Sequence, residues 1–114
     1  MRREAQYLAD ILEAADAIAR FLKGTIREDF LKDEVLQSAV LQKLIVIGEA
    51  AARLPERFRE IYSDLEWADV IGFRNIAVHA YFSVNWSIVW NTATRDVPVL
   101  RIKIAEIIGP GLSE

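Results

Sequence analysis

The stretch DEVLQSAVLQKLIVIGEAAARL, residues 33–54, decides how this chain folds. Its apolar residues recur at spacings of three and four, which is the period of an α-helix. Beside the main apolar stripe, Leu41, Ile45 and Ala52 form a second one. A helix that is apolar on more than one face lies at the centre of a bundle, at an interface, or both. We therefore expect a central helix that ends near Arg53.

Two starting points fit this helix. Thr25 with Glu28 matches a capping box, and Asp33 is a second candidate for the N-cap residue. Gly48 lies inside the helix, where a glycine costs about 1 kcal/mol relative to alanine. A glycine at such a position predicts that another backbone approaches closely there.

Helical periodicity continues on both sides of this stretch. Gly24 and Pro55 each end a segment, and Pro98 suits the first turn of a final helix. The expected helical segments are residues 4–23, from 25 or 33 to 53, 56–61, from 65 or 67 to about 82, from a cap at Ser83 or Asn85 to about 93, and 98–108. No segment alternates with the period of two that is typical of strands. The predicted fold class is all-α, an antiparallel bundle of four or five helices in a single domain, residues 1–114.

The composition adds an expectation about assembly. A chain of 114 residues is long enough for one domain with its own core. Apolar residues make up 53% of it, which is more than the usual share of about 45–50%. Because small domains have much surface for their volume, we expect part of this apolar surface to be buried by oligomerisation.

Residue counts exclude several kinds of chemistry. The chain has no cysteine, so it has no disulfide, thiolate zinc site or cysteine nucleophile. A single histidine cannot build a multi-histidine metal site, and the carboxylates lack metal-site spacing, so we expect no metal and no cofactor. The net charge of −3 argues against broad binding of nucleic acid. A local basic cleft remains open, because 10 of the 14 basic residues are arginine.

The sequence also bears on where the protein works. No apolar run approaches the ~20 residues that cross a bilayer. The N-terminal residues lack the apolar core of an export signal. We therefore expect a cytoplasmic protein without a membrane partner.

The segment RNIAVHAY, residues 74–81, gathers Arg74, Asn75, His79 and Tyr81 in an otherwise apolar stretch. Each has an ordinary structural interpretation, as an ion-pair member or a packing residue. In a straight helix Arg74 and His79 lie about 140° apart around the axis, whereas Asn75 and His79 share a face. Arg74 and His79 can meet one target in two ways. Either the helix distorts near His79, or two chains face each other across a shared cleft, which the apolar composition favours.

Other residues carry weaker signals. Arg53, Arg57 and Arg59 flank Pro55 and can extend a basic rim for RNA, but a solvated turn balanced by nearby glutamates is the favoured interpretation. Glu49 either pairs with Arg74 across the bundle or is simply exposed. The tryptophans are expected in the core or at an interface rather than as platforms for bases.

Arg74-x4-His79-x-Tyr81 resembles the R-x4-H-x-Y motif of the HepT family of HEPN-domain proteins. Three further segments resemble that family in order along the chain: residues 47–51, 67–75 and 89–100. The resemblance implies a helical HEPN fold that forms a homodimer, with the motifs of both copies lining one cleft. It also implies a metal-independent ribonuclease, the toxin of a toxin–antitoxin pair. Its implied antitoxin is an MntA-type nucleotidyltransferase that transfers AMP to Tyr81.

The chemistry of the motif residues is compatible with cleavage of RNA. His79 can serve as base or acid near neutral pH, and Arg74 offers a charged, forked donor to a phosphate. Asn75 can orient His79 or bind a phosphate oxygen, and Tyr81 can stack on a base. A second hypothesis stays open, in which the chain is a non-catalytic HEPN module that binds its nucleotidyltransferase partner or a nucleotide.

Overall fold

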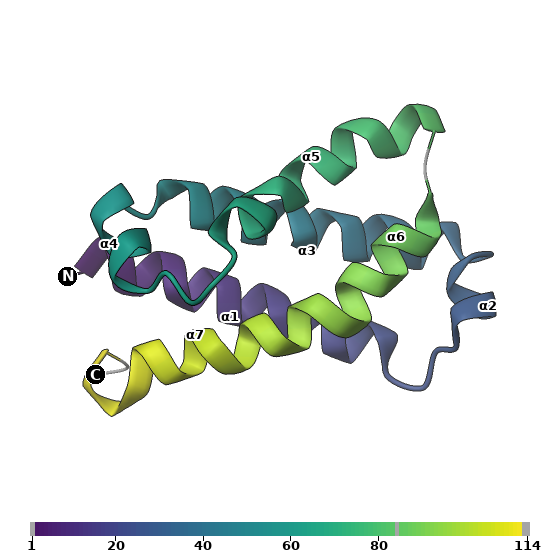
Figure 1. The fold of residues 1–114 in the computed structure, drawn as a ribbon. Coiled ribbons are helices and arrows are strands. Elements are labelled where there is room, and N and C mark those ends of the chain that lie inside the picture. The colour runs from purple at the N-terminus through teal and green to yellow at the C-terminus, as the bar shows by residue number, and fades with distance from the viewer. Residues whose placement is uncertain (1, 84, 113–114) are drawn as a thin grey trace.

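The computed structural model describes the backbone of residues 2–83 and 85–112, and the side chains of residues 3–76 and 85–109. Most of these residues are helical, short turns connect the helices, and none of the described residues forms a strand (Figure 1). The α-helices are α1 (Arg2–Leu22), α2 (Arg27–Phe30), α3 (Glu34–Arg53), α4 (Glu56–Ile61), α5 (Trp67–Ser83), α6 (Trp86–Asn91) and α7 (Val97–Leu112), with a π-helical turn, η1 (Thr92–Asp96), before α7. The predicted all-α class is confirmed.

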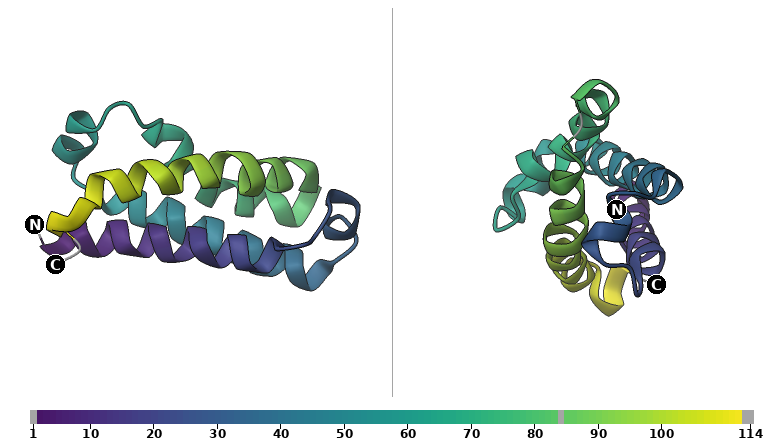
Figure 2. Two further views of the ribbon diagram at one scale, coloured as in Figure 1. Left: turned by 90° about the horizontal axis from the view of Figure 1, so that it is seen from below. Right: turned by 90° about the vertical axis from the view of Figure 1, so that its right-hand side faces the viewer.

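The long helices α1, α3, α5 and α7 form an antiparallel bundle (Figures 1 and 2). Helix α3 packs against α1 on one side and against α5 on the other, while α7 packs against α1. In the second apolar stripe Leu41 is buried, while Ile45 and Ala52 are half-buried. Because α3 packs against helices on two sides, the prediction of a central helix is confirmed. By length and composition alone α3 could also cross a membrane, but 44% of its apolar 18-residue window is buried inside the fold.

Of the two predicted starts, the central helix uses Asp33, whose carboxylate accepts a hydrogen bond from the Leu36 N–H at 3.0 Å. The Thr25–Glu28 capping box is wrong, because the N-cap of α2 is Ile26, without a side-chain cap. Phe30 explains the break between the two helices. Its ring is fully buried, with its centroid 5.4 Å from that of Trp90. Burial of Phe30 turns the chain, and its carbonyl accepts from Gln37 at 3.0 Å.

The C-terminal part is straighter than predicted. Of the two predicted caps, Ser83 and Asn85, helix α6 uses Asn85, whose side chain accepts from the Ser87 N–H at 3.1 Å. The chain then runs through η1 into α7 with Pro98 in the first turn of α7, as predicted, but without a break before it. A proline lacks an N–H and its ring collides with the carbonyl four residues earlier. The wider π-helical turn just before Pro98 accommodates both effects.

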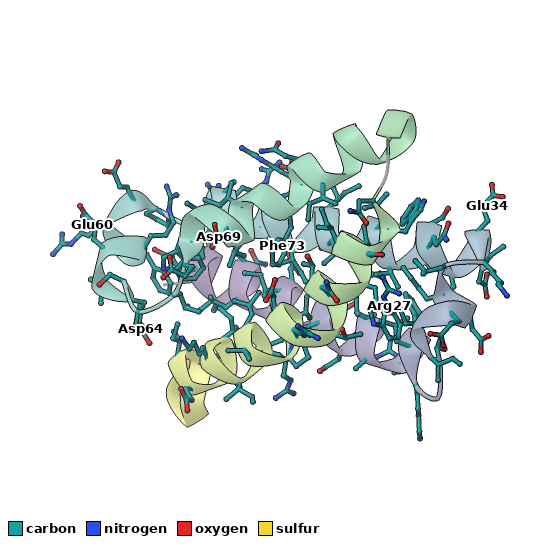
Figure 3. All side chains as sticks on the ribbon, turned by 45° about the vertical axis from the view of Figure 1, so that its right-hand side comes forward. Arg27, Glu34, Glu60, Asp64, Asp69 and Phe73 are labelled. Atoms are coloured by element: carbon teal, nitrogen blue, oxygen red, sulfur yellow. The ribbon has the colours of Figure 1, made fainter. Side chains whose placement is uncertain are left out.

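Polar contacts also connect elements that are distant in sequence. Arg27 of α2 donates to the Ser87 hydroxyl of α6 (Figure 3). Arg101 of α7 donates from Nε to the Asp16 carboxylate of α1 at 3.0 Å. This hydrogen bond, with the attraction of the carboxylate charge, raises the pKa of Arg101 above its usual value. The pair links α7 to α1. The predicted end of the final helix near residue 108 agrees with the positive φ of Gly109, a non-helical residue inside α7.

Candidate functional site

Helix α5 carries the whole Arg74–Tyr81 motif. The side chains of residues 77–84 lie outside the described part of the structure, so the predicted roles of His79 and Tyr81 stay predictions. The backbone of α5 is α-helical from Trp67 to Ser83. Of the two ways to bring Arg74 and His79 together, distortion of the helix is therefore not observed. A regular helix directs these two positions about 140° apart.

Gly48 sets the place where α5 crosses α3. A β-carbon added to Gly48 would lie 2.7 Å from the backbone nitrogen of Arg74 and 3.0 Å from the carbonyl oxygen of Ile71. Such distances are too short for real side chains. The predicted close approach of another backbone is confirmed, and that backbone belongs to the first residue of the motif.

Arg74 lies beside Glu49 on this crossing. Its Nη1 atom is 3.6 Å from Oε1 of Glu49, and the two side chains are 40% and 48% exposed. Of the alternatives left open for Glu49, pairing with Arg74 is confirmed. Phe73, the neighbour of Arg74, is buried, so α5 presents an apolar face inward (Figure 3) and the guanidinium group at the surface. Asn75 is exposed.

Two hollows of the described surface lie beside α7. One hollow lies between the start of α5 and α7, over Val70 and Leu100, and another lies between α1 and α7. Neither is lined by Arg74. The Arg74 side chain is 40% exposed, so a single copy offers its guanidinium group at the surface.

The remaining candidates fall into two groups. Trp67 is a core residue, as predicted: it is buried and donates from Nε1 to the Tyr62 carbonyl at 2.9 Å. Arg53 and Arg57 are exposed, while Arg59 is half-buried and its Nε atom has no recorded acceptor. The basic rim stays a prediction. Within the described residues, no three acidic or histidine side chains are grouped to hold a metal ion.

Comparisons with known proteins identify the family to which this chain belongs. Residues 11–107 match the family model described as "Ribonuclease HepT-like". The chain is 38% identical over 108 residues to "Putative RNase TTE0752" of Caldanaerobacter subterraneus subsp. tengcongensis, covering 95% of this chain and 96% of that protein. It is 35% identical over 106 residues to "Probable ribonuclease HepT" of Thermococcus cleftensis, covering 93% and 96%. No solved structure matches significantly. Both matches span nearly the entire chain, which therefore belongs to the HepT-like ribonuclease family.

Proposed function

We propose that this protein is a metal-independent ribonuclease whose site is completed by a second copy of the chain. The observation that supports this most strongly is the continuous helix α5, with Arg74 half-exposed on it. One such helix directs Arg74 and His79 about 140° apart. A two-fold pair of α5 helices lets Arg74 of one copy and His79 of the other face the same phosphate.

The proposed reaction uses the 2′-hydroxyl of the RNA as the nucleophile. His79 of one copy accepts the proton of that hydroxyl, and the 2′-oxygen attacks the adjacent phosphorus. The bond from phosphorus to the 5′-oxygen breaks, and an acid protonates the leaving oxygen. The dimer holds two imidazoles, enough for one base and one acid. Arg74 stabilises the negative charge that gathers on the phosphate oxygens, and Asn75 orients His79 or binds one of those oxygens.

Apolar side chains left at the surface support the proposed homodimer. Val99 and Ile102 of α7 are 53% and 58% exposed, and Ile61 and Ile88 are exposed as well. Contact with another molecule would remove such surface from water, which is favourable by roughly 25 cal/mol per Å². The 53% apolar composition points the same way.

We further propose that the protein is the toxin of a toxin–antitoxin pair and acts in the cytoplasm. Its partner is an MntA-type nucleotidyltransferase. In the proposed modification the Tyr81 hydroxyl attacks the α-phosphorus of ATP, forming a phosphodiester and releasing pyrophosphate. Arg74 and Tyr81 are seven residues apart, so a regular helix places them about 20° apart around its axis and about 10 Å apart along it. The added phosphate would block the cleft and compete with RNA for Arg74.

The test is cleavage of RNA by the purified, unmodified protein in EDTA. We expect cleavage by the wild type and its loss in Arg74→Ala and His79→Ala. Arg95→Ala is the matched control, because Arg95 is an exposed arginine of η1, outside the motif. Cleavage that requires a divalent metal, or that survives both motif substitutions, contradicts the proposal. Absence of cleavage together with binding of the partner would favour the non-catalytic module.

A further inference from the structure

The Glu49–Arg74 pair joins the central helix to the motif helix. Glu49 follows Gly48, where α5 comes so close to α3 that no β-carbon fits. The Glu49 carboxylate is consequently held at the level of Arg74, with 3.6 Å between Oε1 and Nη1. Among the described residues, Glu49 is the one acidic group recorded against the Arg74 guanidinium.

The Glu49–Arg74 pair contributes little to the stability of the fold. The two side chains are 40% and 48% exposed, so water and salt screen their attraction. Exposed ion pairs contribute little to stability. Burial of α3 and α5 rests instead on apolar residues such as Ile47, Val70 and Phe73, which are buried.

The position of the pair matters for an arginine that binds phosphate. A free arginine side chain samples many rotamers, and ordering it opposes binding. A guanidinium group has five N–H donors, and the contact recorded with Glu49 is at Nη1. Glu49 can therefore hold Arg74 in one orientation while other donors face outward. The same carboxylate places a negative charge where the RNA phosphate approaches, which weakens binding.

We infer that Glu49 is a positioning residue for Arg74, which orients the guanidinium group for the transition state at the expense of RNA affinity. This inference rests on the proposed function of Arg74 as the residue that contacts phosphate. It predicts opposite effects on the two steps of the reaction. Removal of the Glu49 charge strengthens the binding of RNA, and removal of the group that orients Arg74 slows the chemical step.

Two substitutions separate these effects. Glu49→Gln removes the charge but keeps a side-chain oxygen at the same reach, which can accept from Arg74. We expect KM to fall about three- to tenfold, with kcat within about threefold of the wild type. Glu49→Ala removes both the charge and the acceptor. We expect the same fall in KM, but a loss of kcat of about tenfold or more, because a misplaced catalytic group is costly. Glu13→Gln, on the exposed face of α1, is the matched charge control and should change neither value.

A second measurement separates this inference from the proposed activity. In a His79→Ala background, which cannot cleave, Glu49→Gln should bind a fluorescein-labelled single-stranded RNA about three- to tenfold more tightly. It should also show a steeper dependence of affinity on salt, by up to about 0.7 in the logarithmic slope. If the wild type fails to cleave RNA, the proposed function is contradicted. The binding comparison still tests the role of Glu49, because it does not depend on cleavage.

Three results would overturn the inference. Affinity for RNA that is unchanged or weaker in Glu49→Gln would exclude competition with the phosphate. Equal kcat values in Glu49→Gln and Glu49→Ala would exclude an orienting role. A change in Glu13→Gln of the same size would assign the effect to net charge alone.

Discussion

Substitution of Gly48 by alanine tests the helix crossing that places Arg74. The new β-carbon would start 2.7 Å from the backbone nitrogen of Arg74, whereas ordinary contacts begin at 3.4 Å. Because that atom belongs to the backbone, α5 must move away by about 0.7 Å, the difference between these two distances. Overpacking of this kind costs about 1–3 kcal/mol. The better helix propensity of alanine returns about 1 kcal/mol, so the expected net loss is about 0–2 kcal/mol.

Gly72→Ala is the control for this experiment. Gly72 lies on α5, two residues before Arg74, and a β-carbon there would meet no atom within 4 Å. Alanine should stabilise the protein at this position by about 1 kcal/mol. Urea denaturation of both variants should therefore separate them by about 1–3 kcal/mol, because the gain in propensity is common to both. In the RNase assay we expect Gly48→Ala to lose about 10- to 100-fold in kcat/KM, since Arg74 moves with α5. Equal stability of the two variants would refute the close crossing.

Three further predictions concern other parts of the chain. Asp33→Ala should lower the free energy of unfolding by about 1 kcal/mol in urea denaturation, because it removes the N-cap of α3; an unchanged value would mean that the cap contributes nothing. Phe30→Ala should cost about 3–5 kcal/mol, because the ring is fully buried against Trp90; a loss below 1 kcal/mol would contradict its place in the core. Arg74→Ala should reduce the slope of log affinity for single-stranded RNA against log salt by about 0.7 for each lost contact, and an unchanged slope would argue against a phosphate contact.

The parts of the fold that depend on local sequence could be predicted. The central helix follows from apolar spacing within one segment, and its end near Arg53 follows from Pro55. The cap of α6 at Asn85 is likewise a local signal. The close approach at Gly48 could also be predicted, because a glycine that lowers helix propensity needs a reason in the packing. That the approaching backbone is that of Arg74 could not, because it depends on the register between two helices.

The remaining differences arise from contacts that are distant in sequence. The Thr25–Glu28 capping box competes with burial of Phe30, which depends on Trp86 and Trp90 far along the chain. Packing of α7 along α1 holds the C-terminal segment straight, so that a π-helical turn forms before Pro98. Tertiary packing prevails over local signals in both places. For the candidate site, residue types and spacing predicted the motif and gave pairing of Glu49 with Arg74 as one alternative, which the structure confirms.

The central claim is that Arg74 of one copy and His79 of the other act on the same phosphate. Mixing Arg74→Ala with His79→Ala tests it most directly, because their heterodimer keeps one Arg74 and one His79 on different chains. The two variants are unfolded and refolded together, and RNA cleavage in EDTA is compared with that of each variant alone. We predict that the mixture cleaves RNA faster than either parent but more slowly than the wild type, because the heterodimer keeps one composite Arg74–His79 site and only one of the two imidazoles that serve as base and acid. A mixture no more active than the better parent, with heterodimers shown by native mass spectrometry, would contradict the composite site.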